Sequence, residues 1–428
     1  MFSTQLWSLI TLSDSPPFSF SALCLDRSGT TTPLEIEIRL SNRLWGYLEE
    51  PEPELYTFGM LDALEFIVEN GGTTSRWKSF WLYTPGDIDI EPHETALGFI
   101  QNSPMPALER FEIKYDGPHY KDFEDHQRDD LRNKPLFLDP PTRLKAATLE
   151  WIPNSCLFTI PTRPQLVGLT RLEIMFPETH PELERFHALL SASPALSILS
   201  IDTRRMCYDR SSSVDGRAVV RLPKIHLPNL RALALLFSSR TIIPWWEHSL
   251  LLMLNAPNVE SLRLWLEGHA YWVPQNQDLV EYIAKGPDSA DPKPLFPYLT
   301  GLELFIKQDR RAPRSDPDEE LLAAYPGLRT LVLPHLARHN GLRVRPWLVP
   351  SLVRLIIHVR SPSELEEAIY ERCAAGMAPK VVEVPMLSEA HIEREGSKYS
   401  KVLDGLGVEV CFSHSNHRVR EALRFEEP

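Results

Sequence analysis

The chain has 428 residues, of which 43% are hydrophobic and 24% charged, a composition typical of a folded protein with a sizeable core. Its formal net charge of −13 disfavours general binding to nucleic acid, because the phosphates would be repelled. The longest apolar stretches, such as residues 248–257, are too short to cross a bilayer, so we expect no membrane span.

The first twenty residues contain the apolar stretch LWSLITL but no basic flank before it and no small-residue cleavage site. We therefore expect no secretory signal. The cysteines are scattered and odd in number, and they never form a C-x-x-C pair, so they indicate reduced thiols and a cytoplasmic or nuclear location rather than a disulfide framework. They are Cys24, Cys156, Cys207, Cys373 and Cys411.

Farther along, one short pattern recurs: a proline, any residue, and then apolar residues at the first, fourth and sixth positions of a strand-like stretch. Segments 77–82, 144–149 and 169–174 keep this apolar spacing without the proline. The same template fits 53–60, which we interpret as part of a helix, and 379–386, which we interpret as a last strand. The seven complete copies are PALERFEI (106–113), PALSILSI (194–201), PNLRALAL (228–235), PNVESLRL (257–264), PYLTGLEL (297–304), PGLRTLVL (326–333) and PSLVRLII (350–357).

Segments with the apolar spacing of helices lie between these strands. Successive strands start from 24 residues apart, at Leu328 and Leu352, to 40 residues apart, at Val259 and Leu299. Strands alternating with helices at this interval predict an α/β fold: an irregular leucine-rich-repeat solenoid, or horseshoe, with parallel strands on the concave face and helices and loops on the convex face. The helical segments are 94–101, 182–190, 277–284, 318–325 and 363–375.

The strand period of two separates core from surface. Side chains at the fourth and sixth positions point into the core, and those at the third, fifth and seventh positions line the concave surface. Leu262 and Leu264 thus face the core, whereas Arg263 faces solvent, where its replacement by alanine should change stability by no more than about 0.5 kcal/mol.

Aromatic, arginine and carboxylate side chains gather on this predicted concave surface, a combination that protein interfaces favour. The alternative is that its aromatic side chains are covered by neighbouring loops or by the C-terminal segment, as we expect for the bland row of Ala232, Ala234 and Leu236. The predicted partner-binding residues are Trp81, Tyr83, Arg110, Glu112, Arg171, Arg263, Trp265 and Phe305.

These patterns divide the chain into an N-terminal lead-in over 1–32, a solenoid over 33–360 and a C-terminal α/β cap over 361–428. The cap comprises the helical segment 363–375, the strand-like KVVEV and VEVCF, and the helical pattern SNHRVREALRF. A terminal cap is expected because the last repeat would otherwise expose a strand edge and bare core.

Several segments resemble those of a known family. TQLWSLITL (4–12), LDRSGTTTPLEIEIRL (25–40) and TSRWKSFWL (74–82) resemble the region that follows the F-box in fungal F-box proteins with irregular leucine-rich repeats. PPTRLKAATLEWIP (140–153) and LPNLRALAL (227–235) are similar to their repeats. In that family the F-box docks on the adaptor of a cullin-type ubiquitin ligase, while the repeats choose the substrate. The resemblance implies a non-catalytic scaffold that binds a ubiquitination substrate.

No F-box pattern precedes Leu6, so docking on the ligase adaptor is expected only if an F-box lies upstream. Two alternatives remain open at this point. The start of the chain is misassigned and the F-box is missing from it, or the chain is an F-box-less paralogue with no role in ubiquitin transfer.

Three other polar segments give weaker evidence for catalysis, phosphate binding or metal binding. The insertion 117–130 carries acidic and histidine side chains that a metal-dependent enzyme could use, but so polar a run between strands is more typical of a solvated loop. The arginines of 308–320 suit a phosphorylated partner, although a charged loop is again the simpler interpretation. Cys411, His414 and His417 lack the second pair of ligands that a zinc site needs.

No G-x-S-x-G elbow, P-loop or dinucleotide fingerprint occurs in the chain. We therefore predict a protein that is not an enzyme and has no catalytic residues, no cofactor and no metal. Its partner would be a protein, and it would bind neither nucleic acid nor membrane.

Overall fold

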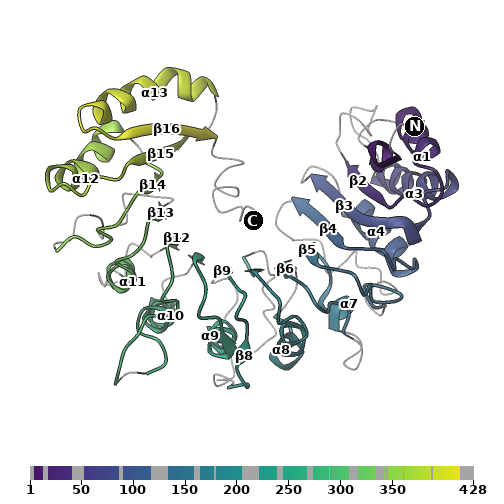
Figure 1. The fold of residues 1–428 in the computed structure, drawn as a ribbon, viewed down its shortest axis with the longest axis horizontal. Helices are drawn as coiled ribbons and strands as arrows, with labels where there is room; N and C mark the ends of the chain where they lie inside the picture. The colour runs from purple at the N-terminus through teal and green to yellow at the C-terminus, as the bar shows by residue number, and fades with distance from the viewer. Residues whose placement is uncertain are drawn as a thin grey trace. The chain divides into compact units, whose positions relative to one another are not determined.

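The computed structural model has an α/β fold in which fourteen described strands belong to a parallel sheet and follow one another in chain order (Figure 1). The described residues are 4–12, 18–40, 53–85, 90–116, 134–158, 164–177, 180–204, 221–238, 244–267, 273–288, 290–307, 317–333, 342, 346–359, 361–386 and 389–414.

The chain divides into two compact units. The first comprises 1–196 with 201–213 and 221–226, and the second comprises 197–200, 214–220 and 227–428. The predicted boundaries, which follow residues 32 and 360, stay predictions. Strands of the predicted lead-in and of the predicted cap belong to the sheet, since β1 pairs in parallel with β2 and β15 with β14.

The first unit is built from strands joined by helical crossovers. In chain order, α1 connects β1 to β2, α3 lies between β2 and β3, and α4 connects β3 to β4. The strands are β1 (Leu9–Leu12), β2 (Leu34–Arg39), β3 (Trp77–Pro85), β4 (Arg110–Asp116), β5 (Ala146–Glu150), β6 (Arg171–Met175), β7 (Ile198–Asp202), which reaches the second unit, and the short β8 (Ile225–His226). The helices are η1 (Thr4–Trp7), α1 (Ser19–Ser28), α3 (Pro53–Glu69), η2 (Thr74–Arg76), α4 (Glu91–Gln101), α7 (Asn154–Phe158) and α8 (Leu183–Ser191).

The second unit repeats the same alternation, and the last of its described helices, α13, packs beside the last of its described strands, β16. Its strands are β9 (Ala232–Ser238), β10 (Leu254–Asn255), β11 (Ser261–Glu267), β12 (Gly301–Lys307), β13 (Thr330–Leu333), β14 (Arg354–Ile357), β15 (Val381–Met386) and β16 (Glu409–His414). Its helices are α9 (Pro244–Met253), α10 (Val273–Lys285), α11 (Pro317–Ala324), α12 (Pro362–Ala374) and α13 (Glu389–Asp404).

The structure confirms the predicted elements within the described residues. Each of the ten strands inferred from the repeat is present, as are the five helices, and residues 53–60 are helical while 381–386 form a strand. Sequence reasoning missed β1 and did not count β2 as a strand, and among the helices it missed α1, α7, α9 and α13. The predicted insertion at 117–130 and the helical pattern at 415–425 lie outside the described residues.

The recurring proline has a local cause. In six of the seven copies the residue two positions after it donates its N–H to the carbonyl of the residue just before it, as Leu230 does to Leu227 at 3.2 Å and Leu328 to Tyr325 at 3.2 Å. This is the hydrogen bond of a four-residue turn, and proline occupies its second position, where the fixed φ of its ring is favoured. The pattern therefore starts each strand with a preset turn.

The next residue links neighbouring repeats. Glu260 donates its N–H to the carbonyl of Arg231, and Thr300 in turn donates to Glu260, both at 2.8 Å. Because the equivalent bond recurs in repeat after repeat within each unit, the strands stay in one register. The apolar residues that follow then face the same side, and Leu262 and Leu264 are buried as predicted.

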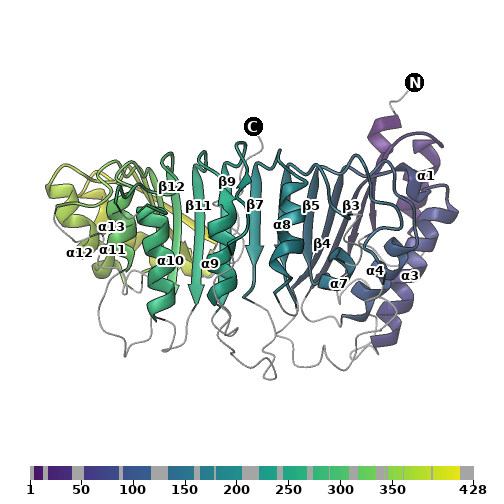
Figure 2. The same ribbon diagram turned by 90° about the horizontal axis from the view of Figure 1, so that it is seen from below.

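Within each unit the described helices lie on one side of the sheet (Figures 1 and 2). Alternate strand residues point to the opposite side, which we call the open face. No described helix has the length and hydrophobicity that a membrane span requires.

Candidate functional site

The open face of the first unit arranges its side chains in rows that run across the strands. The paired register places Glu37 beside Trp81, Trp81 beside Glu112, Glu112 beside Thr148, and Thr148 beside Glu173. We call these five residues the middle row. A second row lies two residues farther along the strands and consists of Arg39, Tyr83 and Lys114. A third row lies two residues before the middle row and consists of Glu35, Ser79, Arg110, Ala146 and Arg171.

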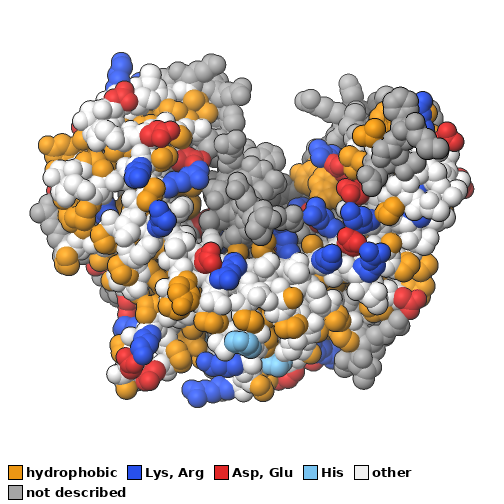
Figure 3. Space-filling view, in the orientation of Figure 1, with side chains coloured by type: hydrophobic (Ala, Val, Ile, Leu, Met, Phe, Trp, Pro, Cys, Tyr) orange, Lys and Arg blue, Asp and Glu red, His pale blue; other side chains and the backbone are white. Residues whose placement is uncertain are grey.

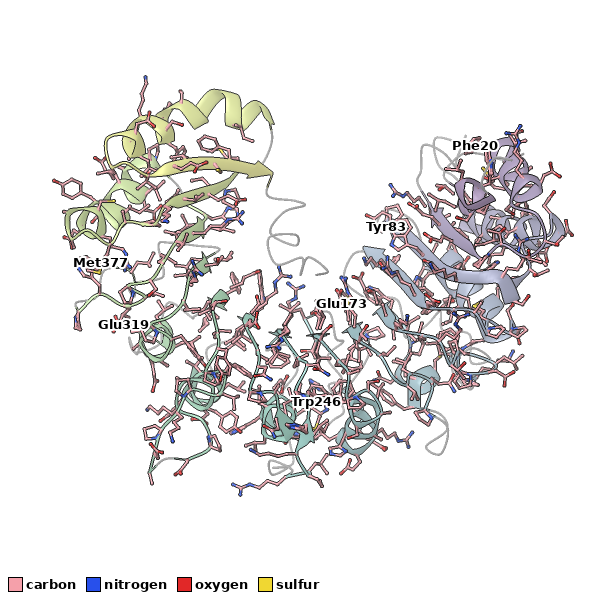
Figure 4. All side chains as sticks on the ribbon, viewed as in Figure 1. Phe20, Tyr83, Glu173, Trp246, Glu319 and Met377 are labelled. Atoms are coloured by element: carbon pink, nitrogen blue, oxygen red, sulfur yellow. The ribbon has the colours of Figure 1, made fainter. Side chains whose placement is uncertain are left out.

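An aromatic patch occupies one end of this surface. The rings of Trp81 and Tyr83 stack with centroids 6.0 Å apart and planes 14° from parallel. The guanidinium carbon of Arg39 lies 5.0 Å from the centroid of the Trp81 ring, and its Nε donates to the Glu37 carboxylate at 2.6 Å. Trp81 and Tyr83 are half-buried, so each keeps part of its ring available (Tyr83 is labelled in Figure 4).

Ion pairs within single strands order the charges of this surface. Lys114 Nζ donates to Glu112 at 3.0 Å, and Arg171 Nε donates to Glu173 at 2.6 Å. The Lys114 and Glu112 side chains are 32% and 21% exposed, so the pair is partly solvated and adds little stability. Figure 3 shows basic side chains with acidic ones among them where β3 to β6 lie. Arg110 is exposed beside them.

The open face of the second unit differs. Arg263 Nε donates to Glu303 at 2.7 Å across the β11–β12 pair, and these side chains are only 16% and 3% exposed. Trp265 stacks on Phe305 with centroids 3.7 Å apart. Phe305 is 9% exposed, so unlike Trp81 it is not presented to solvent. Arg263 therefore does not simply face solvent as predicted, because it is a partner of the buried Glu303 carboxylate. We now expect its replacement by alanine to cost more than about 0.5 kcal/mol.

The predicted bland row behaves as expected. Ala232, Ala234 and Leu236 of β9 are buried although their positions lie on the open face. They stand beside Ser261, Arg263 and Trp265 in the β9–β11 register. In this part of the second unit, therefore, buried side chains continue from the helix side of the sheet to the open face.

Sequence reasoning missed several members of the surface. Glu37 and Arg39 were overlooked because β2 lacks the proline of the repeat, although the alternating pattern LEIEIR identifies it as a strand with one polar face. Glu303 was not predicted as the partner of Arg263 because the pattern within one repeat does not show which residue of the next strand lies beside it. Aligning PNVESLRL with PYLTGLEL places these residues side by side.

The buried histidine His93 lies apart from this surface. Burial in α4 lowers the pKa of His93 to about 4, an effect that the backbone of Trp151 partly opposes. His93 packs against Tyr115, whose ring faces the helix side of the sheet, so it lies away from the open face. No group of three metal-ligating side chains occurs among the described residues.

The middle row and the Trp81–Tyr83 patch thus combine apolar area, a cation over an aromatic ring and ordered charges on a rigid sheet. Such an arrangement can hold a second macromolecule by shape and charge, but it provides no activated nucleophile. Comparison with known proteins adds no relative: no protein-family model matches the chain, and a search of curated proteins finds no significant match.

Proposed function

We propose that this chain is a non-catalytic protein-interaction scaffold and that the open face of its first unit selects the partner. The observation that carries the proposal is the half-buried stack of Trp81 and Tyr83 with Arg39 over the Trp81 ring. Stacked aromatic rings offer a partner a large contact area at little loss of side-chain entropy. Because both rings stand on a paired strand, they are already in place before binding.

We also infer that the sheet belongs to an irregular leucine-rich-repeat solenoid. The preset turn, the backbone link from one repeat to the next and the helix after each strand support this inference, since each repeat buries its apolar face only against its neighbours. In such a solenoid the helix-free face of the strands would be concave and is the usual place for a partner.

The binding test compares captured proteins. Wild-type protein and a Trp81→Ala/Tyr83→Ala variant are immobilised and exposed to a lysate of the source organism, and bound proteins are quantified by mass spectrometry. The matched control is Tyr298→Ala/Tyr370→Ala, which removes two exposed tyrosines away from the open face. A partner lost only from the Trp81→Ala/Tyr83→Ala variant, with an unchanged melting temperature, supports the proposal. Identical partners for all three proteins contradict it.

The narrower form of the proposal is that the bound protein is a substrate for ubiquitin transfer, as the resemblance to F-box receptors implies. This role needs an F-box to dock on the ligase adaptor. Sequencing the 5′ end of the transcript decides between the alternatives. An upstream in-frame exon with a helical F-box pattern supports the ligase role, and an in-frame stop codon immediately before Met1 supports an F-box-less scaffold.

A further inference from the structure

We propose that the open face of the first unit accepts a helix of the partner protein, laid across the strands along the middle row, and that this helix carries a basic residue at every seventh position. The inference rests on the proposed function, because it names the kind of partner that the same surface takes. It starts from the order of side chains in the row: Glu37, Trp81, Glu112, Thr148, Glu173.

The spacing of the carboxylates matches a helix. Neighbouring strands of a sheet are about 4.8 Å apart, so Glu37, Glu112 and Glu173, which stand on every second strand, follow one another at roughly 9.6 Å. Helical residues seven positions apart lie on one face and are separated by about 10.5 Å. Lysine or arginine at these positions would meet the three carboxylates in turn.

The residues between the carboxylates fit the same helix. Trp81 stands halfway between Glu37 and Glu112, and Thr148 halfway between Glu112 and Glu173. A helix offers a residue three or four positions after each basic one, on the same face. An apolar side chain there would pack on the half-buried Trp81 ring, and a small one would lie over Thr148, which is buried.

The flanking rows limit the charge of the helix. Arg39 and Lys114 lie on one side of the middle row, and Arg110 and Arg171 lie on the other, each about 6.6 Å away along the strands. One carboxylate, Glu35, shares the row of Arg110 and Arg171, so the two flanks together hold four cations and one anion. These cations repel a helix that is basic all round and attract acidic residues on its two flanks. The predicted partner is therefore a helix with a basic seam and acidic flanks.

An extended peptide fits less well. A spacing of 9.6 Å corresponds to about three residues of a strand, and successive strand residues point to opposite sides, so every second basic residue would face away. The carboxylates remain able to take a second cation, because each has two oxygens and the same-strand pairs are partly solvated. The net charge of −13 attracts a basic segment over a longer range.

The test uses a display library of helical peptides randomised on one face and selected on the full-length chain. Affinities of recovered peptides are then measured by fluorescence anisotropy for wild type and for Glu37→Gln/Glu112→Gln/Glu173→Gln. The matched control is Glu182→Gln/Glu260→Gln/Glu281→Gln, since these glutamates also belong to ion pairs, are exposed and lie outside the row.

Selected peptides should carry lysine or arginine at seven-residue intervals with an apolar residue between. Their binding should weaken at least about tenfold in the middle-row variant and fall with added salt, while the control variant binds as wild type does. Two results separate the inference from the proposed function. Peptides without this spacing that still depend on Trp81 and Tyr83 overturn the inference alone. Peptides that never depend on the open face overturn both.

Discussion

The two units are built from the same repeat, but the side chains on their open faces differ in burial and in pairing. In the first unit, cations and carboxylates pair along single strands and remain partly solvated, and the Trp81 and Tyr83 rings stay half-buried. In the second unit, Arg263 pairs across strands with the buried Glu303, and Trp265 stacks on a buried Phe305. The open face is therefore partly buried at β11 and β12 of the second unit, whereas the ion pairs on β4 and β6 of the first unit remain partly solvated.

The core beneath both faces should be equivalent, and its disruption gives the largest expected effect. Leu172→Ala in β6 and Leu264→Ala in β11 each remove a fully buried side chain, so each should lower the free energy of unfolding by about 2 to 5 kcal/mol through lost burial and a new cavity. Urea denaturation measures the change. Tyr298→Ala is the surface control, and a small effect at either leucine would contradict the assignment of strand faces.

Acid should weaken the first unit through His93. Its pKa is about 4 in the folded chain and about 6.5 when unfolded. Because the folded value is the lower one, the full contribution to stability is present above pH 6.5 and is lost as pH falls toward 4, where the unfolded chain takes up a proton that the folded chain resists. The expected loss is about 3 kcal/mol over that range.

Denaturation at a series of pH values measures this loss, and hydrogen exchange around α4 locates it. His93→Leu removes the titrating group and should flatten the profile between pH 6.5 and 4. An equally steep profile in the variant would show that other groups cause the acid sensitivity.

The stability lost when the cation of an ion pair is removed should differ between the two open faces. Arg263→Ala removes a cationic partner of the buried Glu303 carboxylate and should cost about 2 to 3 kcal/mol, below the cost for a fully buried pair because Arg263 is 16% exposed. Arg263→Ala/Glu303→Gln removes the buried charge as well and should recover most of that loss. If both variants are equally unstable, packing by the arginine rather than its charge is responsible.

The corresponding pairs of the first unit should give the smallest effect. Lys114→Met and Arg171→Met remove cations whose carboxylates stay partly solvated, so each should change the free energy of unfolding by no more than about 0.5 kcal/mol. The same denaturation series measures them beside Arg263→Ala. A loss as large as that of Arg263→Ala would mean that the two faces are energetically alike.

The sequence by itself determined the repeat and its core. The proline-started turns, the apolar residues at the fourth and sixth positions and the helical segments between them are local patterns, and local patterns suffice because each repeat is built from neighbouring residues. It also indicated which strand residues point away from the helices, since a strand alternates faces with a period of two.

Only the tertiary structure decided what each of those residues does there. Tyr83 and Phe305 both occupy the seventh position of the pattern, yet Tyr83 is half-buried and Phe305 is buried. Arg171 and Arg263 differ in whether their carboxylate partner is solvated. Exposure and pairing depend on the neighbouring strands and on what packs over them. Those neighbours lie about 25 to 40 residues away in the chain, so the spacing within one repeat carries no information about them.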